Sequence, residues 1–280
     1  MSNINNYLNN KLKELSNNAY IGKENKESDK IETSIDNIIK SIRSYFDKNF
    51  EKNFIHNITI FGSYKRGTIL PRYYDDNSDI DIMIVFNTKD FKQFKPEIYR
   101  NYIKKFAENT YPRSFVYKDA PSIVIELNHI NFDLVPAKKI EYFFGNDICI
   151  PDTDNKWQKT DPIGFDRVLT EINKKNDNIV KPVIRLLKLW NCGNNYPYLS
   201  FYLEHSIVKI INNRFNFSKI NYLSGFFYVV NNLSIFNLPD YKAKEVTMLK
   251  ENLKKLELSL KQDNYDRLNE LLGKIFNLEI

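Results

Sequence analysis

Two stretches decide the fold of this chain: Phe-Gly-Ser-Tyr-Lys-Arg-Gly-Thr at residues 61–68 and Ser-Asp-Ile-Asp-Ile at residues 78–82. The first continues a short apolar run, residues 58–61, which favours a strand that ends at a Gly-Ser turn. In the second, two aspartates alternate with isoleucines before a continuous apolar run, which is typical of a buried strand over residues 78–86. Because residues i and i+2 of a strand point to the same side, Asp79 and Asp81 are predicted to share one face.

A third carboxylate interrupts another predicted strand. Residues 122–127 and 130–135 indicate two strands joined by a tight turn, and the second strand carries Asp133. Phosphoryl transfer with two metal ions needs clustered carboxylates, because the ions lie only about 4 Å apart. We therefore predict that Asp79, Asp81 and Asp133 are catalytic and bind two Mg²⁺ ions, for which Mn²⁺ can substitute. Asp133 is also expected to accept the proton of an attacking hydroxyl.

The Gly-Ser turn has a matching role. Gly62 lets the backbone approach a phosphate closely, and the Ser63 hydroxyl, with amides at the start of a following helix, can cradle a nucleotide triphosphate. Lys65 and Arg66 add two cations, and Arg66 is a candidate NTP-binding residue. A lone Gly-Ser is only a turn, and a lone Asp-x-Asp is usually a strand end that meets solvent. The combination, with each carboxylate in an otherwise apolar strand, favours catalysis, because burying carboxylates without a cation is costly.

The remaining periodicity divides the chain in two. Residues 29–46 and 98–109 predict amphipathic helices, and residues 151–162 predict a polar, irregular connector. We expect an α+β lobe with N-terminal helices at residues 1–160, which carries the predicted catalytic residues, and a helical lobe at residues 161–280. The predicted helices of the second half span residues 162–176, 179–191, 199–214, 222–233, 242–262 and 265–276.

The composition bounds the class of protein. With 42% hydrophobic residues and a net charge of +6, the chain is an ordinary globular protein whose charge alone does not indicate nucleic-acid binding. The only two cysteines, Cys149 and Cys192, make no disulfide framework and no zinc motif, which favours a reducing cytoplasm. Residues 1–10 lack the apolar segment of a signal peptide, and the most apolar run, residues 222–236, is interrupted by polar residues. We expect neither export nor membrane insertion.

Together these motifs resemble the polymerase-beta-like nucleotidyltransferases, and more narrowly the bacterial cGAS/DncV-like enzymes of anti-phage defence, the CD-NTases. The likeness covers most of residues 54–204. It rests on residues 61–68, 78–82, 132–136 (Phe-Asp-Leu-Val-Pro), 157–162 (Trp-Gln-Lys-Thr-Asp-Pro), 182–190 and 199–204. The resemblance implies an α+β fold, in which a polymerase-beta-like lobe with a mixed β-sheet is packed on a C-terminal α-helical lobe.

The same resemblance implies further site residues. Gly62 and Ser63 would form the phosphate turn, and Lys188 and Ser200 would reach the donor triphosphate from the helical lobe. Lys188 shares a helix face with Lys181 and Arg185, which predicts a short basic stripe or, in the plainer interpretation, a solvated face. Residues 69–77 lengthen the path to the aspartates and are expected to form a surface loop, in which Asp76 is a candidate fourth carboxylate. The Cys/His zinc insertion of the animal relatives is absent from the sequence.

The implied activity is template-independent synthesis of a cyclic di- or trinucleotide second messenger from NTPs with release of pyrophosphate, in CBASS-type signalling. The expected partners are the NTPs and a downstream effector that senses the product. We expect a monomer, no membrane partner and no obligate nucleic acid. One alternative is a tRNA or RNA 3′-end nucleotidyltransferase, but the residues after Glu204 contain no recognisable RNA-binding motif. A second alternative is a non-catalytic antitoxin of the same fold, against which the presence of all three carboxylates argues.

Overall fold

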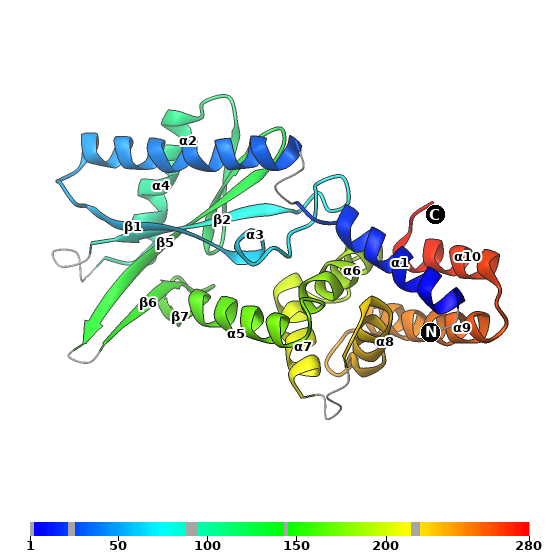
Figure 1. Ribbon diagram of the computed structural model, residues 1–280. Helices are drawn as coiled ribbons and strands as arrows, with labels where there is room; N and C mark the ends of the chain where they lie inside the picture. Colours follow the sequence, from blue (N-terminus) through cyan, green and yellow to red (C-terminus); the bar gives the residue numbers. More distant parts are fainter. Residues whose placement is uncertain (1–2, 22–25, 88–93, 143–144, 214–218, 280) are drawn as a thin grey trace. The chain divides into compact units, whose positions relative to one another are not determined.

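The computed structural model describes residues 3–21, 26–87, 94–142, 145–213 and 219–279. Figure 1 shows the elements in chain order. The helices are α1 (Asn3–Asn18), α2 (Lys26–Asn49), α3 (Gly62–Arg66), α4 (Pro96–Thr110), α5 (Pro162–Lys175), α6 (Val180–Gly193), α7 (Ser200–Asn212), α8 (Tyr222–Asn232), α9 (Asp240–Lys261) and α10 (Tyr265–Phe276). The strands are β1 (Ile55–Phe61), β2 (Asp79–Phe86), β3 (Phe115–Asp119), β4 (Ser122–Glu126), β5 (Asn131–Tyr142), β6 (Gly145–Pro151) and β7 (Trp157–Thr160).

The internal contacts divide the chain into two compact units. Unit 1 comprises Met1–Tyr20, Tyr73–Asp76 and Arg167–Ile280, and unit 2 comprises Ile21–Arg72 and Asn77–Asp166. Unit 2 therefore contains the whole β-sheet, whereas α1 is grouped with the C-terminal helices and not with the sheet that follows it in sequence. From the sequence, all of residues 1–160 were expected to form one lobe. The division into domains at residues 160 and 161 stays a prediction.

The sheet of unit 2 is mixed. Its strands run in the order β1-β2-β5-β4-β3, while β6 pairs with β5 and β7 pairs with β6. Strands β2 and β5 are parallel, and the other pairs are antiparallel. This arrangement brings the two aspartate-bearing strands side by side. In the sequence, 44 residues separate the end of β2, Phe86, from the beginning of β5, Asn131.

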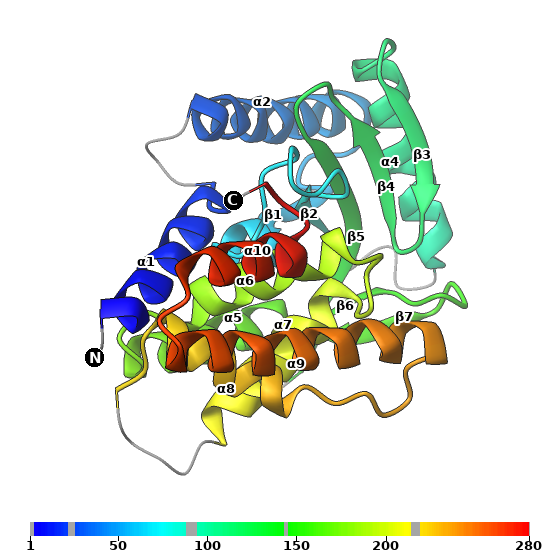
Figure 2. The same cartoon turned by 90° about the vertical axis from the view of Figure 1, so that its right-hand side faces the viewer.

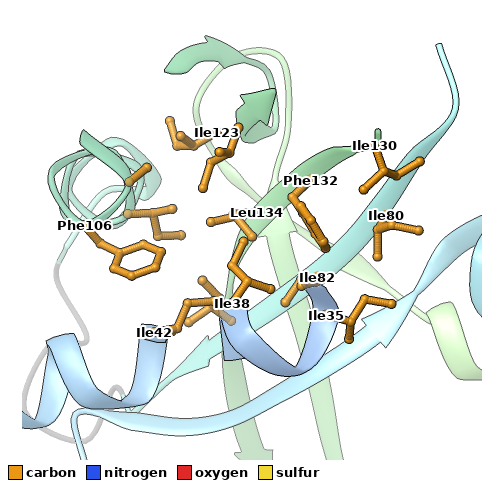
Figure 3. Close-up of a cluster of buried hydrophobic side chains, with 14 of the residues drawn as sticks. Ile35, Ile38, Ile42, Ile80, Ile82, Phe106, Ile123, Ile130, Phe132 and Leu134 are labelled. Carbon is orange, nitrogen blue, oxygen red and sulfur yellow. The ribbon is translucent and has the colours of Figure 1, made fainter. Parts of the chain in front are cut away.

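One face of this sheet packs against helices α2 and α4 (Figure 1). The isoleucines that alternate with the aspartates, Ile80 and Ile82, are fully buried there. Figure 3 shows them meeting Ile35, Ile38 and Ile42 of α2, Phe106 of α4, and Phe132 and Leu134 of β5. Because side chains alternate along a strand, burying this set directs the aspartates to the opposite face of the sheet. The hydrophobic core thus sets the orientation of the predicted catalytic side chains.

The opposite face has a smaller apolar cluster. Met83, Val85 and Ala137 are buried there, and Phe61, Ile148 and Ile150 pack against them. Since Met83 and Val85 continue the series Asp79, Asp81 at period two, the carboxylates occupy the beginning of this face and the apolar cluster occupies its continuation.

The connector at the end of unit 2 differs from the sequence prediction. Residues 151–162 were predicted to be an irregular connector, but Trp157–Thr160 forms strand β7, paired with β6. The Trp157 ring packs against the main core, and its Nε1 donates a hydrogen bond to the Phe94 carbonyl at 3.2 Å. The strand is held by this anchor and by pairing with β6, neither of which leaves a pattern in a polar four-residue segment.

Unit 1 is built around helix α6, in which the residues from Val180 to Asn191 are buried apart from Lys181. Helix α1 lies alongside α6 (Figure 2) and also packs against α8. It buries Ile4, Leu8, Leu12 and Leu15. These apolar residues recur at helical spacing within a polar sequence, so α1 is amphipathic. Among the described residues, no helix is long and apolar enough to cross a membrane.

The predicted basic stripe on α6 is wrong. Arg185 and Lys188 are each only 6% exposed and contribute no solvated cationic surface. The Arg185 Nε donates to the Ser16 carbonyl at 3.0 Å, and its guanidinium lies over the Tyr20 ring, 4.5 Å from the centroid. Burial lowers the pKa of Arg185 to about 10, so the group remains charged at neutral pH.

Replacing Arg185 by Ala is therefore expected to destabilise unit 1. The change leaves the buried Ser16 carbonyl and hydroxyl without their charged donor and opens space beside Tyr20. We expect a loss of about 2–4 kcal/mol in the free energy of unfolding, measured by urea denaturation. The exposed Lys209→Ala on α7 is the control and should change it by less than about 0.5 kcal/mol. Equal losses in the two variants would contradict a structural role for the Arg185 contacts.

Candidate active site

The predicted catalytic carboxylates lie on neighbouring parallel strands. In the register of β2 and β5, Asp81 pairs with Asp133, and Asp79 pairs with Asn131. Paired residues of adjacent strands lie about 5 Å apart and project to the same side. Asp79, Asp81 and Asp133 therefore share one face, and all three are partly buried. The period-two prediction is consistent with this arrangement.

Asp133 has a perturbed titration. Burial, reinforced by the negative charge of Asp79, raises the pKa of Asp133 to about 7. The Ser122 hydroxyl donates a hydrogen bond to Asp133 Oδ2 at 3.0 Å and opposes this shift. Ser122 begins the neighbouring strand β4, and its Oγ also lies 2.8 Å from the Asp119 carbonyl, so its single proton is shared between these two acceptors. The structure thus identifies Ser122 as a partner of Asp133, which nothing in the sequence indicated.

Gly62 is required by two features of the structure. Its φ of +72° is in the left-handed region, which disfavours residues with a Cβ. A Cβ at this position would lie 1.7 Å from Asp81 Oδ2, so the Asp81 carboxylate occupies the space that any other residue would fill. The sequence attributed Gly62 to close approach of a phosphate. The structure adds that it allows close approach of Asp81.

The turn after Gly62 is held by backbone hydrogen bonds. The Ser63 carbonyl accepts from the amides of Thr68 at 3.0 Å and Ile69 at 3.2 Å. Gly67, with φ of +70°, ends the short helix α3 in the left-handed conformation. These bonds close the loop on itself and fix Ser63 beside the strand that carries Asp81, because β1 and β2 are paired up to Phe61 and Asp81.

The aspartates do not converge into a preformed metal site. Within the described ranges, no three His, Cys, Asp or Glu side chains are grouped as ligands. Asp81 is directed at Gly62, and Asp133 is bonded to Ser122. The donor set nevertheless fits Mg²⁺, which prefers carboxylate oxygens. Burial and the negative charge of Asp79 raise the pKa of Asp133, and a divalent cation beside it would favour the ionised form.

Arg66, a candidate NTP-binding residue, is engaged within unit 2. Its side chain is 7% exposed, and its NH1 lies 3.4 Å from Asp166 Oδ1 at the start of α5. The guanidinium also lies over the Phe165 ring, 5.3 Å from the centroid. These contacts join α3 to the first turn of α5. A role for Arg66 in NTP binding stays a prediction.

Lys188 and Ser200, the other candidate NTP-binding residues, belong to unit 1. The Lys188 Nζ lies 3.4 Å from Glu204 Oε1, and both side chains are buried. Ser200 is the first residue of α7, and the preceding Tyr198 is held by two hydrogen bonds between its backbone and the Asn191 amide, of 2.9 and 3.0 Å. Their roles in NTP binding stay predictions.

Asp76 was the candidate fourth carboxylate. It is exposed and lies in the Tyr73–Asp76 segment that is grouped with unit 1. Its neighbour Asp75 is buried instead and accepts a hydrogen bond from the Tyr196 hydroxyl at 2.6 Å. The prediction of a surface loop over residues 69–77 is wrong at four positions, because Ile69, Leu70, Pro71 and Asp75 are buried.

Residues 7–173 match the family described as the Second Messenger Oligonucleotide or Dinucleotide Synthetase domain, SMODS, over more than half of the chain. The chain belongs to this family. The predicted membership among the CD-NTases is therefore confirmed. The SMODS match includes the Gly62-Ser63 turn and all three aspartates.

A curated relative of this SMODS chain is a probable cyclic nucleotide synthase of Bacillus cereus. The two are 30% identical over 132 residues, which are 45% of this chain and 40% of the relative. The aligned part of the chain thus spans less than half the length of that protein.

Two solved structures share the fold over nearly the whole length of the SMODS chain. The CdnC of Escherichia coli MS115-1, solved with ATP, has a TM-score of 0.67 at 13% identity and covers 96% of this chain and 97% of its own. The CD-NTase CdnG of Bradyrhizobium diazoefficiens, solved with GTP, has a TM-score of 0.65 at 11% identity and covers 96% and 98%. The predicted fold class, α+β with a polymerase-beta-like nucleotidyltransferase sheet, is confirmed.

Proposed function

We propose that this SMODS protein is a Mg²⁺-dependent, template-independent nucleotidyltransferase that makes a cyclic di- or trinucleotide from NTPs. The observation that carries the proposal is the common face of Asp79, Asp81 and Asp133, set by the parallel register of β2 and β5. Family membership supports the chemistry, and the ATP and GTP bound by the two solved relatives support NTPs as substrates.

The reaction would join a ribose hydroxyl to the α-phosphorus of an NTP. The new O–P bond forms as the bond from the α-phosphorus to the bridging oxygen breaks, and pyrophosphate leaves. Asp133 accepts the hydroxyl proton, because an ionised carboxylate beside the attacking hydroxyl can act as a general base. Asp79, Asp81 and Asp133 would hold two Mg²⁺ ions, which supply Lewis-acid stabilisation of the charge that develops on the phosphate oxygens.

The remaining residues would bind and orient the donor. Gly62 and Ser63 would hold its triphosphate at the fixed turn, with Arg66, Lys188 and Ser200 as further contacts. A second transfer on the linear product closes the ring or extends it to a trinucleotide. The product would act on a downstream effector in CBASS-type anti-phage signalling, in the cytoplasm, where the two free cysteines of the chain are stable.

The test is incubation of the purified protein with four labelled NTPs and Mg²⁺ or Mn²⁺, followed by phosphatase treatment. We expect a phosphatase-resistant oligonucleotide, because a cyclic product has no terminal phosphate. The control is the double variant Asp79→Ala, Asp81→Ala, which should form none. Its thermal unfolding verifies that it is folded, as expected since both side chains lie on the face opposite the main core.

The alternatives give different products. Labelling of added tRNA without an NTP-only product would establish an RNA 3′-end nucleotidyltransferase in place of the proposed function. Absence of any product with every NTP, both metals and tRNA would favour a non-catalytic protein of the same fold. Light scattering on the same sample tests whether the protein is a monomer, as we propose.

A further inference from the structure

The chain leaves unit 2 for four residues just before the first catalytic aspartate. Arg72 and Asn77 belong to unit 2, whereas the Tyr73–Asp76 segment between them belongs to unit 1. Only Asn77 and Ser78 separate this segment from Asp79, the first residue of β2. The strand that presents two of the three carboxylates thus begins just after the Tyr73–Asp76 segment, which we call the tether.

Hydrogen bonds hold the Tyr73–Asp76 segment within unit 1. The Tyr196 hydroxyl donates to Asp75 Oδ1 at 2.6 Å, and the Cys192 thiol shares its proton between the Tyr74 carbonyl at 3.3 Å and the Leu189 carbonyl at 3.2 Å. The Tyr73 hydroxyl donates to the Asn18 carbonyl at 2.8 Å. The partners come from the end of α1, from α6 and from the turn after α6. The segment is therefore held by parts of unit 1 that lie far apart in the sequence.

The bond to Asp75 is the strongest of these contacts. Asp75 is a carboxylate of which only 6% is exposed, and a buried charge is stable only when it is hydrogen-bonded. A hydroxyl donor to a carboxylate is also a stronger bond than a neutral pair. Tyr196 is itself held in place: its amide donates to the Asn191 carbonyl at 2.8 Å, and its φ is +49°.

Only a short length of chain separates Asp75 from Asp79, so a movement of Asp75 is transmitted to the start of β2. Adjacent Cα atoms are about 3.8 Å apart, so three steps connect Asp76 to Asp79 at a reach of roughly 11 Å. Ser78, the residue before Asp79, is buried. Loss of the Tyr196 bond would therefore be felt at the start of β2, where the carboxylates must converge on metal ions about 4 Å apart.

We propose that Tyr196 and Asp75 are positioning residues for Asp79: by holding the Tyr73–Asp76 segment, they restrain the chain that leads into β2 and keep the start of this strand, and with it Asp79, ordered for metal binding. The inference rests on the proposed function, because it takes Asp79 as a metal ligand. It adds a role for the hydrogen bond between Tyr196 and Asp75, neither of which was a predicted site residue.

The test compares Tyr196→Phe and Asp75→Asn with a matched control, Tyr7→Phe. Tyr7 lies in the same unit and loses an equivalent hydroxyl bond, to Asn269 Oδ1 at 2.9 Å, without contact to the tether. Two readouts are measured: amide hydrogen exchange of peptides covering residues 77–81 without ligand, and the Mg²⁺ concentration that gives half of the maximal rate. Thermal unfolding verifies that each variant is folded.

In Tyr196→Phe we expect exchange at residues 77–81 to be roughly tenfold faster, because the tether loses its strongest contact. The half-saturating Mg²⁺ concentration should rise roughly tenfold, as when the supporting partner of a metal ligand is lost, with a smaller change in KM for the NTP. Asp75→Asn keeps an acceptor oxygen for Tyr196, so both readouts should move in the same direction by a smaller factor. Tyr7→Phe should match the wild type in both.

Wild-type exchange and wild-type Mg²⁺ dependence in Tyr196→Phe would overturn the proposal, as would equal changes in Tyr7→Phe. If Tyr196→Phe does not fold, Asp75→Asn decides by the same readouts. If the wild type forms no product from any NTP, that result counts against the proposed function. The positioning role is then tested by Mn²⁺ binding in the presence of a non-hydrolysable ATP analogue. Equal Mn²⁺ affinity in wild type and variant, or no binding by the wild type, overturns it.

Discussion

Asp133→Asn is expected to abolish nucleotide transfer and, at the same time, to stabilise the metal-free protein above pH 7. Activity should fall by roughly 10³-fold or more, because the variant loses both a metal ligand and the proton acceptor. The amide keeps an oxygen that can accept the hydrogen bond from Ser122, so the local structure is retained. The activity is measured as the rate of pyrophosphate release with saturating NTP and Mg²⁺.

The stability gain follows from the pKa of Asp133. The folded protein raises this pKa to about 7, whereas the unfolded chain has the ordinary value of about 3.9. Between these values the folded state binds more protons, so the free energy of unfolding falls as the pH rises, and the full penalty is present above pH 7. Removing the charge should recover up to about 2–4 kcal/mol at pH 8 and almost nothing at pH 4.

The measurement is thermal unfolding of wild type and variant in EDTA at pH 4, 6 and 8. Asp154→Asn is the control, because it makes the same chemical change at a carboxylate that is 74% exposed, and it should not shift the melting temperature with pH. A stabilisation of Asp133→Asn that is the same at pH 4 and pH 8 would show that it arises from packing and not from the buried charge.

Gly62→Ala is expected to reduce the transfer rate by at least roughly 100-fold, the cost of misplacing a catalytic group by about 1 Å. The new methyl group would lie where the Asp81 carboxylate lies, so either the carboxylate or the turn must move. The left-handed backbone adds strain of about 1–2 kcal/mol, which should lower the melting temperature by a few degrees.

Gly67→Ala separates the two effects. Gly67 has nearly the same left-handed conformation, with φ of +70° against +72°, but lies at the other end of α3. It should lose similar stability and retain most of the activity, measured again as pyrophosphate release. Comparable losses of activity in both variants would mean that strain in the turn, and not the approach of Asp81, makes Gly62 necessary.

The aspartate face could be predicted because it depends on local rules. Period-two alternation placed Asp79 and Asp81 on one face, and each apolar run marked its strand. The chemistry of two-metal sites placed Asp133 with these aspartates, and the register of β2 and β5, in which Asp133 pairs with Asp81, agrees with it. The C-terminal helices were likewise predicted to within a few residues, since their apolar positions recur at helical spacing.

What could not be predicted depends on partners distant in sequence. Arg185 looked like part of a basic stripe, because its acceptor, Ser16, lies 169 residues away on another helix. Strand β7 was missed because its anchor is the Phe94 carbonyl, 63 residues from Trp157. The anchor of Asp75 is also distant in sequence: its carboxylate accepts a hydrogen bond from Tyr196, 121 residues further along the chain.

The grouping of α1 with the C-terminal helices has a consequence for synthesis on the ribosome. Helix α1 packs against α6 and α8, which are completed only after more than 170 further residues. At about 5–20 residues per second, the apolar side of α1 stays uncovered for roughly ten to forty seconds while the sheet is completed. Leu8 and Leu12 are therefore exposed to chaperones in the nascent chain, and the helix made before the sheet is buried only after the sheet.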